Sequence, residues 1–308
     1  MAERLGLAIL TGTGWRARDI ETIAREAENA GFEAIFNVEA NNDGLATAQL
    51  MGAVTSRIEV GTWVASIYLR HPYLCAQGAA LIADATGGRM VLGLGVSHQP
   101  INTTLGIDMG SPLAALRHYV AEVQSWLRGE GPATHLPQRP APCPVQVYVA
   151  ALTSKAVELA GEVADGVMPV FWPASRVAQS KTWIARGRAR ASGRGKLEIT
   201  LGLPTFVGDD LEATRAVARQ NLGLYTTFPF YQRLFRLCGF VEAAEKAEQG
   251  AAAAALSDRL LDAVCLIGSM ARCREQLAAF RAAGVDLPIL YPPIGVEAAR
   301  AVIKAFRQ

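Results

Sequence analysis

Short apolar runs rich in β-branched residues alternate along the chain with segments whose apolar residues recur every three or four positions. Ile20, Ile23 and Ala27, for example, share one face of a helix that Gly31 can terminate. Strands that are apolar on both faces and separated by amphipathic helices indicate a parallel sheet with right-handed crossovers. Eight such units in 308 residues predict a closed (β/α)8 barrel, or TIM barrel, rather than an open α/β sheet. The predicted strands are residues 5–10, 34–39, 58–65, 90–97, 145–152, 166–171, 199–207 and 287–291.

Two segments interrupt this simple repeat. Residues 129–144 contain five prolines, so they cannot form a regular helix or a central strand. Residues 209–261 are too long for one crossover helix, and their pattern predicts additional helices. Neither segment has the composition of a linker. We therefore interpret residues 1–308 as a single domain with insertions after helix 4 and after strand 7.

The charge balance argues against several classes of partner. A net charge of +2 creates no field that would favour nucleic acid or an acidic membrane over small molecules. The five cysteines are scattered without a C-x-x-C pair, and no cluster of histidines and acids is visible, so we expect neither disulfides nor a metal. The chain shows no signal-peptide core and no apolar stretch long enough to span a membrane. These features predict a cytoplasmic protein.

Polar or aromatic side chains stand at the ends of most predicted strands. In a (β/α)8 barrel the ligand site lies where the strands end and the following loops begin. These side chains should therefore converge on one mouth of the barrel. They are Thr11, Gly12 and Thr13; Glu39, Asn41 and Asn42; Ser66 and Tyr68; Ser97 and His98; Thr153 and Ser154; and Phe171 and Trp172.

The strand-end sequence GLGVSHQP raises the question of a dinucleotide fingerprint. That fingerprint needs G-x-G-x-x-G at a turn that opens directly into a helix. Here His98 takes the place of the third glycine, Pro100 follows, and the next strong helical pattern begins near Pro112. The fingerprint is therefore excluded. Gly93 and Gly95 are expected to let a ligand ring or a neighbouring backbone approach the strand.

Three stretches, at residues 61–100, 147–167 and 267–290, give the chain a resemblance to a known family. They are similar to the bacterial-luciferase-like monooxygenase superfamily, whose members are (β/α)8 proteins that use FMN or the deazaflavin coenzyme F420. The SHQP sequence at 97–100 looks more like the deazaflavin-using branch than like the luciferases.

The resemblance implies a cofactor site. A non-proline cis peptide after strand 3 would fall at residues 66–67 and press the second residue against the cofactor ring. The phosphate would lie by the backbone of residues 151–153, where free N–H groups and the helix dipole favour an anion. The threonine of that loop could equally cap the helix without any ligand. The predicted cofactor-binding residues are Ser66, Ile67, Gly95, Ser97, Ala151, Leu152 and Thr153.

Glu39 and His98 are the predicted catalytic residues. An acid at a strand end is either functional or paired with a nearby arginine, and we favour function. His98 has a proton suited to acid/base work beside a hydride acceptor, although it could instead hydrogen-bond the loop through Gln99 and Asn102. Many relatives place a histidine after the acid that ends strand 2, whereas this chain has Ala40. His98 could partly replace that missing proton donor.

The substrate is expected to contact Thr11, Asn41, Trp172 and Phe228, the last from an aromatic-rich insertion that would cover the mouth. The preferred function is an oxidoreductase that transfers hydride between non-covalently bound coenzyme F420 and a small organic substrate. One alternative is an FMN-dependent monooxygenase supplied by a separate flavin reductase. Another is a non-catalytic flavin-binding relative. The resemblance also implies a homodimer.

Overall fold

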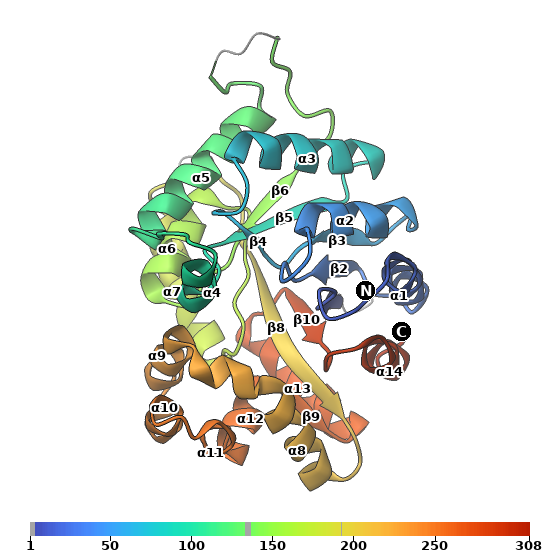
Figure 1. Cartoon of the computed structure of the whole chain (residues 1–308), viewed down its shortest axis with the longest axis vertical. Coiled ribbons are helices and arrows are strands. Elements are labelled where there is room, and N and C mark those ends of the chain that lie inside the picture. Colours follow the sequence, from blue (N-terminus) through green and yellow to red (C-terminus); the bar gives the residue numbers. More distant parts are fainter. Residues whose placement is uncertain (1–3, 133–136, 192) are drawn as a thin grey trace.

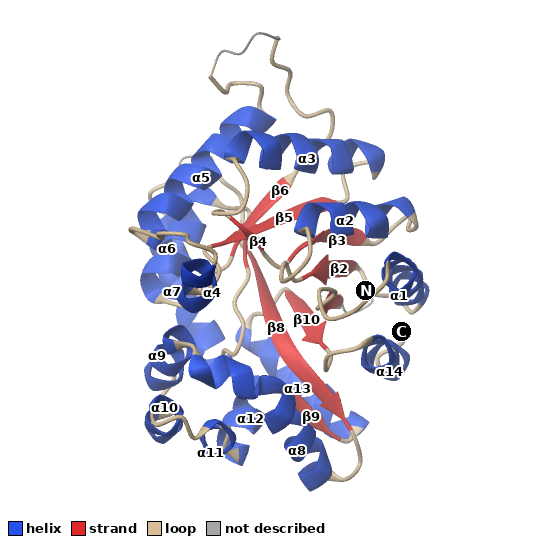
Figure 2. Ribbon diagram, viewed as in Figure 1, coloured by secondary structure: helices blue, strands red, loops and turns tan. Residues whose placement is uncertain are grey.

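A closed parallel barrel forms the centre of the computed structural model, which describes residues 4–132, 137–191 and 193–308. The strand order is β10-β1-β2-β3-β5-β6-β7-β8, and β8 pairs with β10 to close the ring (Figures 1 and 2). This confirms the predicted (β/α)8 fold. The strands are β1 (Gly6–Ile9), β2 (Ala34–Asn37), β3 (Glu59–Thr62), β4 (Ala65–Ser66), β5 (Met90–Gly95), β6 (Gln146–Val149), β7 (Gly166–Val167), β8 (Glu198–Val207), β9 (Leu266–Gly268) and β10 (Leu287–Tyr291).

Helices connect the strands and surround the barrel (Figure 2). Most of them bury one apolar face; α1, for instance, buries Ile20, Ile23, Ala24 and Ala27. The helices are α1 (Ala17–Asn29), α2 (Gly44–Ala53), α3 (Pro72–Ala85), α4 (Gln99–Thr104), α5 (Pro112–Leu127), α6 (Ser154–Val163), α7 (Ala174–Arg188), α8 (Leu211–Leu222), the 3-10 helix η1 (Gly223–Thr227), α9 (Pro229–Leu237), α10 (Val241–Glu248), α11 (Ala252–Ala255), α12 (Asp258–Val264), α13 (Met270–Ala283) and α14 (Val296–Ala305).

Three features of the strands differ from the prediction beyond small shifts of their ends. The predicted strand 58–65 is broken into β3 and β4, and the predicted strand 166–171 is reduced to β7 plus a bridge between Val170 and Gly202. β9 was not predicted, because three residues are too few for a period to be recognised. It pairs with the outer end of β8, which continues beyond the barrel.

The two irregular segments occupy the outside of the barrel. The predicted helical stretch 209–261 contains α8, η1, α9, α10 and α11, and it runs into α12. Figure 1 shows these helices gathered at one end of the molecule. The proline-rich stretch has no helix or strand in its described residues 129–132 and 137–144, as five prolines require.

Trp63 fills the interior of the barrel. It belongs to a cluster of inward-facing side chains that includes Phe36, Met168 and Tyr291, and its ring lies edge-on to that of Tyr291 at 6.1 Å between centroids. Across the barrel, a Cβ atom on Gly202 would lie only 1.7 Å from the indole of Trp63. The indole therefore occupies the space that any larger residue at position 202 would need.

The opposite ends of the barrel differ in charge. At the N-terminal ends of the strands, Arg4 forms an ion pair with Glu33 at 2.7 Å, another with Glu198, and a longer one with Glu59 at 3.6 Å. The hydroxyl of Tyr148 donates a hydrogen bond to Glu198 in the same cluster. Because this end is filled by paired charges, space for a ligand is expected at the C-terminal ends of the strands.

Gly202→Ala tests the packing around Trp63. The added methyl group must displace a rigid indole, so we expect the free energy of unfolding to fall by about 3 kcal/mol, the upper end of the usual cost of overpacking. The matched control is Gly223→Ala, whose new Cβ meets no heavy atom within 4 Å and whose effect should stay within about 0.5 kcal/mol. Urea denaturation of both variants measures the difference. Equal stability of the two would contradict this packing.

Candidate active site

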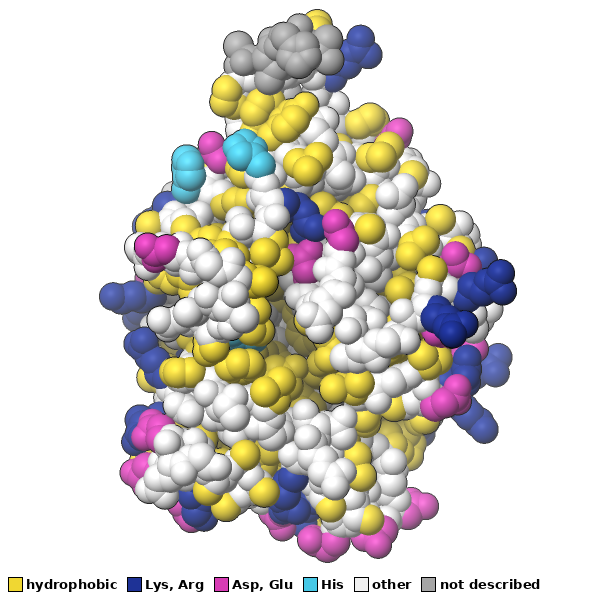
Figure 3. Space-filling view, viewed as in Figure 1, with side chains coloured by type: hydrophobic (Ala, Val, Ile, Leu, Met, Phe, Trp, Pro, Cys, Tyr) yellow, Lys and Arg dark blue, Asp and Glu magenta, His cyan; other side chains and the backbone are white. Residues whose placement is uncertain are grey.

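The C-terminal ends of the barrel strands surround a hollow. Short connections such as α4 and parts of the long insertion such as α9 lie on this face of the molecule (Figure 1). Figure 3 shows that the face is hollowed at its centre and that hydrophobic side chains surround the hollow.

The connection between β3 and β4 forms one wall of the site. Its cis peptide lies at Trp63–Val64, so the prediction of Ser66–Ile67 is wrong. Ser66 ends β4, which pairs with β5, and the amide of Ile67 donates to the carbonyl of Gly95 at 3.0 Å. Counting residues along the sequence could not locate the break, because it depends on where β4 meets β5. We call residues 63–64, between β3 and β4, the bulge. Both predicted residues lie after the bulge rather than within it.

Val64 of this bulge rests on a glycine of the neighbouring strand. A Cβ atom on Gly95 would lie 2.4 Å from Cγ2 of Val64, so any larger residue at position 95 would displace the Val64 side chain. The other glycine of the motif, Gly93, has a Cβ position 2.2 Å from the carbonyl oxygen of Thr62. The two glycines therefore permit close approach of a neighbouring side chain and a neighbouring backbone.

Glu39 fixes the backbone next to the bulge by hydrogen bonds. One carboxylate oxygen accepts a hydrogen bond from the amide of Ser66 at 2.7 Å, and the other accepts from the amide of Gly44 at 2.9 Å and from Arg70 at 2.8 Å. The Glu39 side chain is only 2% exposed. Arg70 also pairs with Asp43 at 2.9 Å. These contacts show that Glu39 positions the backbone of this edge, while its catalytic role stays a prediction.

Thr11 and Asn41 belong to loops that pack on each other rather than to an open substrate pocket. The hydroxyl of Thr11 accepts a hydrogen bond from Asn42 at 2.7 Å, and Thr11 is almost completely buried. Asn41 is exposed and has a φ of 56°, which turns the chain so that Asn42 points inward. The carbonyl of Ala40 approaches Gly12 so closely that a side chain there would be excluded. Asn42, rather than Asn41, therefore connects the loop after β2 to the loop after β1.

His98 lies under an aromatic side chain of the insertion. Its ring stacks on Phe228 of the loop before α9, with 4.6 Å between centroids and an interplanar angle of 8°. Burial lowers the pKa of His98 below its usual value near 6.5. Among the described residues, no side chain or backbone group hydrogen-bonds this imidazole. The predicted alternative, a hydrogen bond to the loop through Gln99 and Asn102, is therefore not found.

The loop after β5 is held by a different residue. Asn102 donates from its side chain to the carbonyl of Val96 at 2.9 Å, and it lies on α4, a short helix that the sequence did not predict. Ser97 adopts a φ of 57°, which redirects the chain between β5 and α4. His98 is brought to the mouth by this turn.

Aromatic side chains from distant segments cover the mouth. Tyr225 of η1 lies edge-on to Phe171 at 5.0 Å, and Tyr231 of α9 lies edge-on to Phe171 at 5.3 Å. The hydroxyls of Tyr225 and Tyr291 are hydrogen-bonded at 3.0 Å. Burial raises the pKa of both phenols, so they stay protonated at neutral pH. Tyr291 was missed, although it ends the predicted strand 287–291 and the strand-end rule could have found it.

Trp172 is not part of the mouth. It is fully buried, its ring lies edge-on to Trp183 of α7 at 6.4 Å, and Arg176 stacks over it at 5.5 Å. It therefore packs the segment after β7 against α7, a place that does not favour the predicted substrate contact. Phe171, its neighbour, turns toward the mouth with a φ of 55°.

The loop between β6 and α6 combines a helix N-terminus with a buried cation. Thr153 caps α6 by accepting a hydrogen bond from the amide of Ala156 at 3.4 Å, while Ala151 and Leu152 are buried. Arg176, which is 5% exposed, donates to the carbonyl of Leu152 at 2.8 Å. Within the described ranges Arg176 forms no ion pair with an acid. A buried, unpaired cation next to a helix N-terminus suits an anionic group such as a phosphate.

The sequence did not single out Arg176. Its signal was weak, because an arginine one turn into a helix usually lies on the surface. Its position just after the apolar strand 166–171 was the available indication. The burial that distinguishes it depends on Trp172 and Trp183, which are near in the sequence, and on the end of α9, which is distant.

Comparison with known proteins identifies the family. The sequence profile described as luciferase-like monooxygenase matches residues 4–287. The chain belongs to the luciferase-like monooxygenase family. This agrees with the resemblance seen in the sequence and with the barrel of Figure 1.

Proteins whose names mention different cofactors resemble this chain. A Mycobacterium tuberculosis protein named provisionally as a coenzyme F420-dependent oxidoreductase is 28% identical, over 86% of this chain and 88% of that protein. The structure of the coenzyme F420-dependent tetrahydromethanopterin reductase of Methanopyrus kandleri has a TM-score of 0.82 and 20% identity, covering 100% of this chain and 98% of its own. The oxygenating constituent of 3,6-diketocamphane monooxygenase from Pseudomonas putida, solved with FMN, has a TM-score of 0.73 and 15% identity, covering 100% and 96%. At these identities the two solved structures show the shared fold alone.

Two further observations concern classes of site. In the described part of the chain, no helix is both long enough and apolar enough to cross a membrane. Across the same residues, histidine, cysteine, aspartate and glutamate side chains do not gather in a group of three or more that could hold a metal ion.

A double-mutant cycle between Glu39 and Arg70 tests the support of the bulge. We expect a coupling energy of about 2 kcal/mol from Glu39→Gln, Arg70→Met and the double variant, because the pair is buried and hydrogen-bonded. The exposed pair Glu242–Lys246 is the control, with an expected coupling below about 0.5 kcal/mol. Urea denaturation of the two sets gives both energies. Equal coupling in the two pairs would show that Arg70 does not stabilise the position of the Glu39 carboxylate more than a surface pair does.

Proposed function

We propose that this member of the luciferase-like family is an oxidoreductase that binds a flavin-type cofactor at the barrel mouth. We further propose that the cofactor is coenzyme F420 and that hydride moves between it and a small organic substrate. The observation that carries the proposal is the apolar surface of Val64, which is seated on Gly95 next to the Ser66 amide that the buried Glu39 holds. Such a rigid apolar surface at the mouth suits the face of a flat ring.

Two parts of the chain fit a cofactor of this kind. Val64 and the adjoining backbone would support the ring. The N-terminus of α6, together with Arg176 behind Leu152, would hold the phosphate, because both contribute positive potential at one place. When bound, the cofactor supplies the atom that donates or accepts hydride, and the protein supplies orientation.

His98 is the group that moves the accompanying proton in this proposal. Its lowered pKa keeps the imidazole neutral at physiological pH, so one ring nitrogen can accept a proton from an alcohol as hydride leaves the carbon. In the reverse direction the same nitrogen returns that proton. Glu39 takes no part in this step, because its oxygens already accept three hydrogen bonds.

The aromatic cover determines which substrates can enter. Phe228, Tyr231 and Tyr225 close the mouth above His98 and exclude water, which strengthens the electrostatic interactions inside. The phenol pair of Tyr225 and Tyr291 offers a hydrogen-bond donor on an otherwise apolar wall. These features favour small, largely apolar alcohols, ketones, imines or alkenes.

The preference for coenzyme F420 rests on the sequence of the site and on the curated relative named for that cofactor. An FMN-dependent monooxygenase that receives reduced flavin from a reductase is the competing function. The water-excluding aromatic cover would serve oxygenation as well, and an FMN-containing structure shares the fold. The two functions differ in the cofactor that binds most tightly.

Anaerobic titrations of the purified apoprotein with coenzyme F420 and with FMN, each oxidised and reduced, test the assignment. We expect coenzyme F420 to bind at least about tenfold more tightly than FMN, which corresponds to about 1.4 kcal/mol. Tighter binding of reduced FMN would make the protein a monooxygenase. Binding of neither cofactor would overturn the proposal. Tight binding without turnover of any alcohol, ketone, imine or alkene would identify a non-catalytic relative.

His98→Gln tests the proton transfer. We expect cofactor affinity to change less than about threefold while turnover falls by about a hundredfold, the usual contribution of a proton-transfer group. In the wild type, alcohol oxidation should decline as the pH falls below 6.5 through the lowered pKa of His98, because the protonated imidazole cannot accept a proton. This decline of alcohol oxidation at low pH should be absent in the His98→Gln variant. His71→Asn, at an exposed cap of α3, is the control and should behave as wild type.

A further inference from the structure

The aromatic cover of the mouth contains a buried hydroxyl group without a partner. Tyr231 of α9 is only 4% exposed, and none of the described residues hydrogen-bonds its phenol. Buried phenols usually have a hydrogen-bond partner, because an unpaired hydroxyl away from water costs free energy. The Tyr231 hydroxyl is therefore available to a ligand.

The other tyrosines show that this arrangement is particular to Tyr231. Within the described ranges, each of them either has a hydrogen-bonded hydroxyl or is exposed to water. Those with a partner are Tyr68, Tyr119, Tyr148, Tyr225 and Tyr291. The exposed one is Tyr73, at 43%. The buried, unpaired phenol therefore belongs to the tyrosine that lies beside His98.

The hydroxyl of Tyr231 also keeps some accessible surface. Other polar atoms without a partner, such as Nε1 of Trp172 and Nε of Arg176, are completely enclosed by the protein. The hydroxyl oxygen of Tyr231 is not enclosed in this way, although its ring is buried. An enclosed atom cannot meet a ligand, whereas an atom with accessible surface can.

His98 provides a second unpaired polar group next to this hydroxyl. The two rings lie 5.5 Å apart between centroids, with 51° between their planes. Phe228 stacks on His98, and Phe171 lies edge-on to Tyr231, so both polar groups stand among apolar rings. Burial raises the pKa of Tyr231, so its phenol keeps a proton to donate. The neutral imidazole of His98 has one nitrogen that can accept.

We propose that Tyr231 and His98 together bind one oxygen atom of the substrate. The inference rests on the proposed function of the mouth and deepens it, because it favours alcohols and ketones over alkenes. The phenol of Tyr231 donates a hydrogen bond to the oxygen, and an alcohol donates its own hydroxyl proton to His98. A ketone oxygen accepts from Tyr231 in the same place. An alkene leaves the phenol unpaired, and a site built around a buried donor discriminates against such a ligand.

The test compares ketones with hydrocarbons of the same shape in a complex that cannot turn over. The protein is saturated with its oxidised cofactor, coenzyme F420 or FMN, which has no hydride to give to a ketone. The probes are cyclohexanone and acetophenone, each paired with the analogue in which a methylidene group replaces the carbonyl oxygen. Calorimetry measures the affinities. We expect Tyr231→Phe to weaken ketone binding about tenfold and to change binding of the methylidene analogues less than about twofold.

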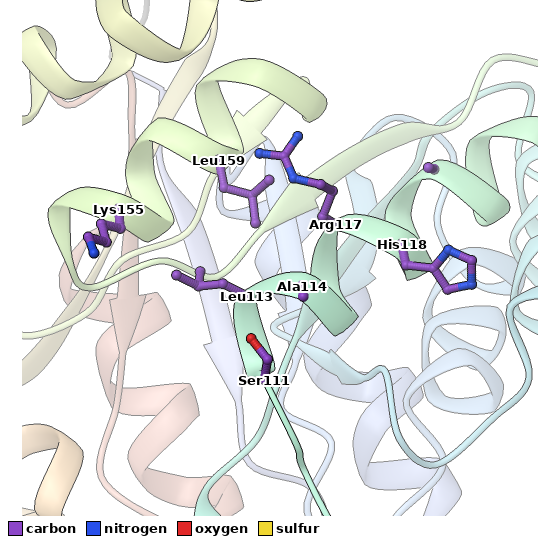
Figure 4. A pocket seen from close by; sticks show the side chains of 8 residues that line it. Ser111, Leu113, Ala114, Arg117, His118, Lys155 and Leu159 are labelled. Carbon is purple, nitrogen blue, oxygen red and sulfur yellow. The ribbon is translucent and has the colours of Figure 1, made fainter.

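The stability of Tyr231→Phe separates binding from a structural role. Removal of an unpaired hydroxyl from apolar surroundings should leave the midpoint of urea denaturation unchanged or raise it. Tyr73→Phe on α3 is the matched control. His118→Gln is a second control, because His118 lines a groove on the outside of the barrel between α5 and α6 (Figure 4). Both controls should bind all probes as the wild type does.

A double variant tests whether the two side chains share one oxygen atom. Cyclohexanol is titrated anaerobically into the protein with reduced cofactor, a pair that cannot react. Tyr231→Phe and His98→Gln should each weaken binding about tenfold. The double variant should lose clearly less than the product of the two single losses, because both side chains act on the same oxygen.

Equal losses for ketones and methylidene analogues in Tyr231→Phe would overturn the oxygen site and leave the cofactor assignment intact. Absence of ketone binding to the wild type loaded with cofactor would do the same, and so would single losses that multiply in the double variant. Failure of both coenzyme F420 and FMN to bind would overturn the proposed function before any ketone is added. The two failures are therefore distinguishable.

Discussion

The buried carboxylate of Glu39 is the interaction on which the site depends. It links the end of β2 to the start of α2 through Gly44, to the bulge through Ser66, and to Arg70 after β4. A buried ion pair is costly to desolvate, and it persists where its hydrogen bonds are satisfied and its geometry is needed. Here that geometry aligns the break between β3 and β4 with Gly95, so that Val64 projects at the mouth from a fixed support.

The barrel separates its charges from its aromatic groups. Arg4 and its acidic partners close the N-terminal end, Trp63 fills the middle, and Phe171, Tyr225, Tyr231 and Phe228 cover the C-terminal end. His98 is buried beneath Phe228 at the covered end, and this burial lowers its pKa. The cation that remains there, Arg176, is buried without an acid in the described residues, which leaves positive potential available for an anionic ligand.

The long insertion completes the site rather than forming a separate surface. Its aromatic residues contact strand ends from β5, β7 and β10, and the carbonyl of Leu237 at the end of α9 accepts from Arg176 at 3.4 Å. A change in the position of α9 would therefore act on both the aromatic cover and Arg176. In the proposed function, substrate choice and cofactor binding would be connected through this helix.

The sequence alone determined the barrel, because apolar strands and amphipathic helices are recognised from residues that are close together in the chain. It also indicated the mouth, since the ends of parallel strands must meet on one face, and it placed His98, Thr153 and Phe228 at or next to that face. Only the tertiary structure decided the break at Trp63–Val64, the pairing of Glu39 with Arg70, the packing of Trp172 against α7, and the burial of Arg176. The break, the ion pair and the burial of Arg176 depend on contacts between residues far apart in the chain, and the packing of Trp172 depends on how the segment after β7 folds back on α7; no local period encodes either.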